Sequence, residues 1–175
     1  MSEYSARVAR VHTTEARQAR HEAAERYKPE PVDLLIVAEA PPGALDRYFY
    51  FEDVTQQDSL FRYVARGVLG AEPTRANKAE LLAQLKERGV FLVDLKPEPV
   101  DGTPLADSVP GLIERCRALA PRAIVLVKAT VYDAVYSPMK RAGLPVVDER
   151  IPFPGSGQQR RFQESLARAL QTASR

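Results

Sequence analysis

The chain has 175 residues, of which 45% are hydrophobic and 27% charged, and its formal net charge is +2. These values are typical of a globular protein, so we expect a single domain over residues 1–175 and no extended disorder. No apolar run approaches the roughly 20 residues that cross a bilayer, and residues 1–10 lack the apolar core of a secretory signal. We therefore expect a cytoplasmic protein that does not contact membranes.

Hydrophobic periodicity predicts alternating helices and strands, with a core over about 32–173. The predicted helices cover about 14–27, 58–69, 77–89, 108–120, 130–142 and 161–173, and the predicted strands cover 32–38, 90–95, 123–127 and 144–147. Asp58 is the expected N-cap of the second helix, and Gly70 follows its end. Asn77 and Glu80 are spaced like a capping box at the start of the third helix.

This order of elements predicts the fold class. The connections between strands are long enough for crossovers, which favours parallel pairing. We expect a three-layer α/β/α domain, in which helices cover both faces of a four-stranded, mostly parallel sheet.

Metal ligands and redox groups are scarce. Cys116 is the only cysteine, and the two histidines, His12 and His21, lie in a polar N-terminal stretch. A single cysteine forms no internal disulfide, and two histidines without cysteine partners are a poor zinc ligand set. We expect no metal and no cofactor.

Polar and aromatic side chains gather where the predicted strands end. The first strand runs into Glu39 and Pro41, and four consecutive aromatic residues follow at 48–51. Ligands of parallel sheets bind beyond the carboxyl ends of the strands. The candidate residues at the four strand ends are Glu39, Pro41, Phe49, Phe51, Asp94, Lys96, Lys128, Arg150, Phe153 and Ser156.

Two interpretations of the charged candidates remain open. Charged groups that close apolar strands are costly to bury unpaired, so Glu39 and Asp94 can form a structural network with Lys96 and Lys128. Alternatively, the carboxylates and lysines line a cleft for a polar or anionic substrate, in which a carboxylate orients water. The second interpretation requires Glu39 and Asp94 to face the same side of the molecule.

Arginines cluster in two places, and either cluster can contact phosphates or form solvated surface. The late cluster consists of Arg150, Arg160 and Arg161. The N-terminal cluster consists of Arg7, Arg10, Arg17, Arg20 and Arg26.

The succession of strand-end motifs resembles the uracil-DNA glycosylase superfamily over about residues 33–170. Val37-Ala38-Glu39-Ala40-Pro41-Pro42-Gly43 is similar to its first motif, with the closest likeness to the bacterial family that carries a Gly-Glu-Ala-Pro-Gly signature. The strand Val90-Phe91-Leu92-Val93-Asp94-Leu95 resembles the one that presents the base-reading asparagine. Phe153-Pro154-Gly155-Ser156 resembles the His-Pro-Ser-type loop before the last helix.

The resemblance implies DNA as a partner and hydrolysis of an N-glycosidic bond after a base is flipped out of the duplex. It gives Glu39 the water-positioning role and either Phe49 or Phe51 the stacking role. Asp94 falls at the position of the asparagine, and Phe153 falls at the position of the histidine. The four cysteines that bind an iron–sulfur cluster in the closest family are absent from this chain.

Two of these positions depart from the family's chemistry. An ionised Asp94 offers acceptors only, whereas an asparagine reads both the N3–H and the O4 of uracil. Phe153 cannot donate a hydrogen bond to a departing anion. Lys128 can supply that charge or contact a phosphate, or it can form an ion pair with Asp94 or Glu39.

Three functions follow from these patterns. The first is a divergent glycosylase for a damaged or deaminated base, and the second is a homologue that binds nucleic acid, a nucleobase or a nucleotide without catalysis. The third is a phosphate-handling enzyme of small molecules that uses Lys96, Lys128 and the Gly155-Ser156-Gly157 loop.

Overall fold

The computed structural model describes residues 3–44, 46–55, 58–99 and 101–174. Within these ranges the sheet has three parallel strands in the order β2-β1-β3, with bounds Leu34–Ala38 (β1), Val90–Asp94 (β2) and Ala123–Leu126 (β3). All five residues of β1 are buried, because this central strand has a neighbour on each side and lies in the hydrophobic core. The register pairs Ala38 with Asp94, so the strands end at the same edge of the sheet.

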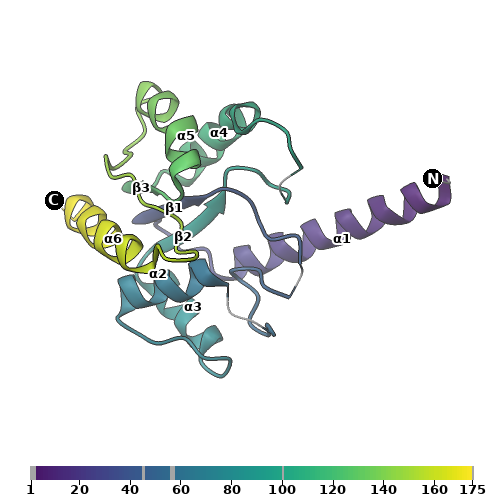
Figure 1. The fold of residues 1–175 in the computed structure, drawn as a ribbon, viewed down its shortest axis with the longest axis horizontal. Coiled ribbons are helices and arrows are strands. Elements are labelled where there is room, and N and C mark those ends of the chain that lie inside the picture. Colours follow the sequence, from purple (N-terminus) through teal and green to yellow (C-terminus); the bar gives the residue numbers. More distant parts are fainter. Residues whose placement is uncertain (1–2, 45, 56–57, 100, 175) are drawn as a thin grey trace.

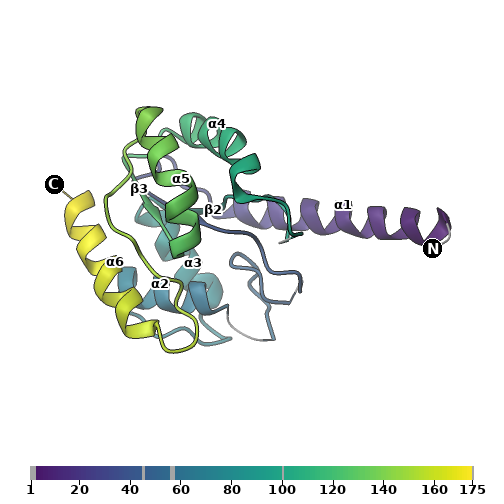
Figure 2. The same ribbon diagram turned by 45° about the horizontal axis from the view of Figure 1, so that its top comes forward.

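The helices lie in two groups around the sheet. Their bounds are Glu3–Arg26 (α1), Ser59–Leu69 (α2), Lys78–Glu87 (α3), Val109–Leu119 (α4), Ala129–Arg141 (α5) and Gln159–Ala173 (α6), with a short 3₁₀ helix η1 at Leu105–Ser108. Figures 1 and 2 show α4 and α5 together on one side of the strands and α2, α3 and α6 on the other. The N-terminal part of α1 extends away from the body in both views. None of the helices in the described part of the chain has the length and apolar character needed to cross a bilayer.

Local signals placed most of these elements correctly. Asp58 caps α2 by accepting a hydrogen bond from the Leu60 N–H, and Gly70 ends the helix in the left-handed conformation, with φ of +66°. The capping box at Asn77 was wrong, because the Asn77 side chain accepts a hydrogen bond from the Thr74 N–H instead of capping α3. Helix α1 begins well before the predicted start at residue 14.

The prediction of a fourth strand at 144–147 was wrong for the described part of the chain. Val146 makes a single parallel bridge to Ile124, and Ile151 makes another to Val127. The Val146 N–H bonds to the Leu144 carbonyl and the Glu149 N–H to the Val147 carbonyl, two residues back in each case. These tight turns bend the chain and prevent a continuous ladder.

Side chains satisfy the outer edge of β2. The buried Tyr50 hydroxyl accepts a hydrogen bond from the Leu92 N–H at 2.7 Å and donates one to the Leu92 carbonyl at 3.0 Å. Arg115 donates to the carbonyls of Asp94 and Leu95 at 2.9 and 3.0 Å. Exposed strand edges template pairing with other chains, so these side chains close the sheet at β2. The aromatic segment 48–51 therefore has a structural role beside any role in binding.

Replacement of Tyr50 by Phe tests this closure. The substitution leaves the N–H and carbonyl of Leu92 buried without partners, and we expect the free energy of unfolding to fall by roughly 1–3 kcal/mol. Urea denaturation measures the change. Tyr48→Phe is the matched control, because the buried Tyr48 hydroxyl has no hydrogen bond in the described part of the chain. Equal stabilities of the two variants would contradict this role for Tyr50.

Candidate functional site

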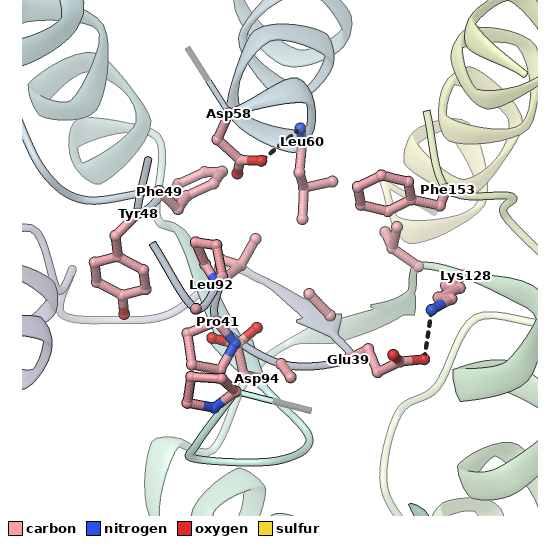
Figure 3. A pocket seen from close by; sticks show the side chains of 16 residues that line it. Glu39, Pro41, Tyr48, Phe49, Asp58, Leu60, Leu92, Asp94, Lys128 and Phe153 are labelled. Atoms are coloured by element: carbon pink, nitrogen blue, oxygen red, sulfur yellow. Dashed lines mark hydrogen bonds and ion pairs between the residues drawn. The ribbon is translucent and has the colours of Figure 1, made fainter. Parts of the chain in front are cut away.

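A pocket of about 430 Å³ lies at the carboxyl ends of the three strands. This volume is in the range of about 300–1,000 Å³ that small-molecule sites occupy. Glu39 and Asp94 both line the pocket, so they meet on one side of the molecule as the strand-end pattern requires. Figure 3 shows Phe49 and Phe153 on opposite sides of the cavity, with Asp58 on the wall across from Asp94.

Asp94 is a carboxyl group that the described part of the chain leaves without a hydrogen-bond partner. It lies half-buried at the end of β2. Burial raises the pKa of Asp94 to about 7, and the nearby Asp58 carboxylate adds to this effect, while the guanidinium groups of Arg115 and Arg20 oppose it. Near neutral pH this side chain is therefore partly protonated, and it then offers one O–H donor and one acceptor.

Asp58 is a pocket residue that the sequence analysis recognised only as a helix cap. Its side chain accepts from the Leu60 N–H at 3.3 Å while it lines the same cavity as Asp94. Burial raises the pKa of Asp58, and hydrogen bonds from the Leu60 and Phe61 N–H groups lower it. Aspartate caps many helices, so no signal in the sequence marked this cap as part of a site.

Lys128 forms an ion pair with Glu39, which is one of the roles that the sequence left open for it. Glu39 Oε2 accepts from Lys128 Nζ at 2.8 Å and from Thr130 Oγ1 at 3.0 Å (Figure 3). Glu39 Oε1 has no hydrogen-bond partner in the described ranges, so it can accept a hydrogen bond from a ligand or from water. An ammonium group has three N–H donors, so Lys128 keeps two after bonding Glu39.

The backbone of Lys128 is strained. Its φ is +83° and its ψ is 131°, a conformation that only glycine adopts easily. The Lys128 N–H donates to the Ile151 carbonyl, and its carbonyl accepts from the Tyr132 N–H at the start of α5. This strained residue lines the pocket, where strain is common in functional sites.

Of the two candidate stacking rings, only Phe49 lines the pocket. Phe49 is buried and packs edge-on against Tyr50 and Phe61. Phe51 packs edge-on against Tyr48, and the structure does not bring it into the lining of this pocket. Phe153 is the more accessible ring, with 39% of its surface exposed. Pro41, also predicted, lies buried in the lining.

Two other candidates lie outside this pocket. Lys96 is 3% exposed, and its ammonium bonds to the Asp101 carboxylate and to Thr103. These contacts satisfy its charge locally, which the strand-end pattern could not reveal. Ser156 is exposed on its loop and does not contribute to the lining. Neither residue supports the phosphate-handling enzyme of small molecules.

The late arginines are largely neutralised. Arg150 forms a bidentate ion pair with Asp133 at 3.0 and 2.6 Å, and Arg160 pairs with Glu164 at 2.8 Å. Arg161 is exposed. These ion pairs reduce the positive charge that the cluster can offer to a nucleic acid.

Comparison with known proteins gives no family for this chain: no family model, curated protein or solved structure matches it. In the described ranges, no group of three or more His, Cys, Asp and Glu side chains is arranged to hold a metal ion.

The raised pKa of Asp94 predicts a specific dependence of stability on pH. In the unfolded chain an aspartate ionises near pH 4, whereas in the folded protein Asp94 keeps its proton to about pH 7. The unfolded state therefore binds fewer protons between these values, and we expect the free energy of unfolding to fall as pH rises from about 4 to about 7. Asp94→Asn cannot ionise and removes this fall.

Urea denaturation across this pH range measures the effect. Asp53→Asn is the control, because Asp53 is exposed on the surface and the substitution should leave the profile unchanged. A profile of Asp94→Asn that matches the unsubstituted protein would contradict the assignment.

A pair of substitutions at Lys128 tests its strain. Both Lys128→Gly and Lys128→Ala remove the ion pair with Glu39, but only glycine relieves the backbone. We expect the glycine variant to be more stable than the alanine variant by about 1–2 kcal/mol. The same two substitutions at Lys140, inside helix α5, should give the opposite order. Thermal unfolding of the four variants distinguishes these outcomes.

Proposed function

We propose that the chain is a divergent relative of the uracil-DNA glycosylases, which takes a flipped base into this pocket and hydrolyses its N-glycosidic bond in DNA. The observation that carries the proposal is the carboxyl group of Asp94. It lies without a hydrogen-bond partner in the described part of the chain, in a cavity of about 430 Å³ that is also lined by the rings of Tyr48, Phe49 and Phe153 and by the carboxyl groups of Glu39 and Asp58. Such a group requires either a proton or a ligand.

Base recognition follows from the protonated form of Asp94. A neutral carboxyl group presents an O–H and a carbonyl oxygen side by side, the same donor and acceptor set as an asparagine amide. It can accept from the N3–H of uracil and donate to its O4, or bind the N1–H and O6 of hypoxanthine in the same way. Ionised Asp94 faces the base oxygen with a second acceptor, at a cost of roughly 1–3 kcal/mol.

The apolar walls supply the remaining binding energy. Phe49 and Phe153 stand on opposite sides of the cavity, and Leu60 and Leu92 complete its apolar lining. Stacking on an aromatic ring contributes roughly 1–3 kcal/mol per base. This gain is comparable to the few kcal/mol needed to unstack and unpair the target.

Glu39 and Lys128 supply groups for hydrolysis. The oxygen of a water molecule attacks C1′ of the sugar, and the N-glycosidic bond breaks with its electron pair on the base nitrogen. Glu39 Oε1 accepts a hydrogen bond from the water and takes its proton. The ammonium of Lys128 stabilises the negative charge on the base, a role that Phe153 cannot fill.

Binding without catalysis is the second candidate function. It is favoured by Phe153, which stands where the related enzymes have a histidine and adds apolar surface to the pocket mouth. A protein of this kind holds the base in the same pocket but releases it unchanged.

Oligonucleotides that each carry one uracil, hypoxanthine, xanthine or alkylated base, as duplex and as single strand, separate the two functions. Alkali cleaves the strand wherever a base has been removed. We expect cleavage of a uracil or hypoxanthine substrate, with a loss of about 10²-fold or more in Glu39→Gln because the water is no longer activated. Asp53→Asn is the control, because Asp53 is exposed and does not line the pocket.

The rate should also fall as pH rises above about 7, because Asp94 then ionises, and Asp94→Asn should abolish this fall. Base-specific binding without strand cleavage would favour the second function. An absence of both on every oligonucleotide would contradict the proposal.

A further inference from the structure

A second cavity, of about 610 Å³, adjoins the base pocket. It lies between α1, α4 and the end of β2, with Phe91 and Val93 of β2 in its lining. The two cavities share a wall, because Pro41, Tyr48, Leu92 and Asp94 line both of them. A ligand in the second cavity is therefore a direct neighbour of one in the first.

The lining of this second cavity has an excess of positive charge. Its basic members are Arg17, Arg20, His21, Lys28 and Arg115, and its acidic members are Glu25 and Asp94. Lys28 pairs with Glu25 at 3.5 Å, while Arg17 and Arg20 share the single carboxylate of Glu98.

Arg115 has no carboxylate within ion-pair distance in the described residues. It donates instead to the backbone carbonyls of Gly111, Asp94 and Leu95. The carboxylates of the described residues therefore do not balance the positive charge of this cavity.

Two buried donors in this lining have too few partners. Arg20 is 6% exposed, yet its only hydrogen bond in the described ranges joins Nη2 to Glu98 Oε2 at 3.2 Å. A guanidinium has five N–H donors, and their burial without partners is costly. Tyr48 is 8% exposed, and its hydroxyl has no hydrogen-bond partner in the same ranges.

The pKa of the Tyr48 hydroxyl reflects its electrostatic neighbours. Burial and the Asp94 carboxylate raise the pKa of Tyr48, and the Arg20 guanidinium lowers it. Tyr48, Asp94 and Arg20 all line the second cavity, and the charges of Asp94 and Arg20 both act on the Tyr48 hydroxyl. The Arg20 guanidinium and the Tyr48 hydroxyl therefore lack hydrogen-bond acceptors among the described residues, and a bound ligand can supply them.

We infer that the second cavity binds a phosphate group, with the guanidinium of Arg20 and the hydroxyl of Tyr48 as its buried donors. The planar fork of an arginine matches two phosphate oxygens, and a phenol adds a third hydrogen bond. Arg17 is an exposed basic side chain in the same lining and adds positive charge beside the phosphate, and the exposed His21 also lies in this lining.

The phosphate can come from a nucleotide whose base occupies the first pocket or from free inorganic phosphate. The shared wall favours the nucleotide, and this part of the inference rests on the proposed function. Among the N-terminal arginines, Arg17 and Arg20 carry this role, and the side chains of Arg7 and Arg10 lie outside the described part of the chain.

Isothermal titration calorimetry at constant ionic strength tests the site with inorganic phosphate, uracil and uridine 5′-monophosphate. We expect saturable phosphate binding that is about tenfold weaker in Arg20→Gln, because a charged hydrogen bond is lost. Arg75→Gln is the matched control, since Arg75 is an exposed arginine that lines neither cavity and should leave binding unchanged. Tyr48→Phe should weaken phosphate binding several-fold, and it carries the test if Arg20→Gln fails to fold.

The three ligands separate the possible failures. If uridine 5′-monophosphate binds more tightly than both uracil and phosphate, a nucleotide spans the two cavities. If uridine 5′-monophosphate and phosphate bind with equal affinity, the second cavity is a site for free phosphate. Phosphate binding without any uracil binding supports this inference while it counts against the base pocket. Absence of saturable phosphate binding, or equal affinities of the unsubstituted protein, Arg20→Gln and Tyr48→Phe, would overturn the inference.

Discussion

The parallel pairing of β1 with both of its neighbours fixes where this protein can do chemistry. Because β1, β2 and β3 run in the same direction, their carboxyl ends meet at one edge, where Ala38 is in register with Asp94. Residues far apart in the chain, such as Glu39, Asp94 and Lys128, then line a single cavity. A shift in the register of β2 would move Asp94 away from this edge, and the cavity would lose its only carboxyl group without a partner in the described residues.

Burial raises the pKa of Asp94 and the nearby positive charges lower it, and the effect of burial is larger. The guanidinium groups of Arg115 and Arg20 favour the ionised carboxylate, but neither donates a hydrogen bond to it. Arg115 donates to backbone carbonyls, and Arg20 donates to Glu98. Desolvation and the Asp58 carboxylate therefore keep the pKa of Asp94 near 7. The pocket thus combines a carboxyl group that keeps its proton to about pH 7 with a charged pair, Glu39 and Lys128. Under the proposed function, this combination binds an uncharged base that carries negative charge as it leaves.

The aromatic segment 48–51 connects stability to binding. Tyr50 closes the edge of β2, Phe49 lines the pocket at the strand ends, and Tyr48 stands in the wall between the two cavities. The fully buried Lys78 holds this segment, because its ammonium donates to the Tyr48 carbonyl at 3.1 Å and lies 4.7 Å from the centre of the Phe61 ring. Burial lowers the pKa of Lys78 to about 8. The rings that contact a ligand are therefore fixed before it binds, which limits the entropy lost on binding.

The sequence by itself determined the parallel α/β class and the position of nearly every helix and strand, because hydrophobic period and helix caps are local. It proposed Glu39 and Asp94 as neighbours, because the ends of parallel strands follow from topology. Tertiary structure decided the rest. The predicted fourth strand at 144–147 forms only a single bridge at Val146, because the N–H groups of Val146 and Glu149 bond to carbonyls two residues back. Lys96 forms an ion pair with the nearby Asp101, whereas Lys128 forms one with Glu39, which follows a neighbouring strand. The proton on Asp94 and the donors of Arg20 and Tyr48 depend on how deeply each group is buried among its neighbours, and burial is a property of the packed chain.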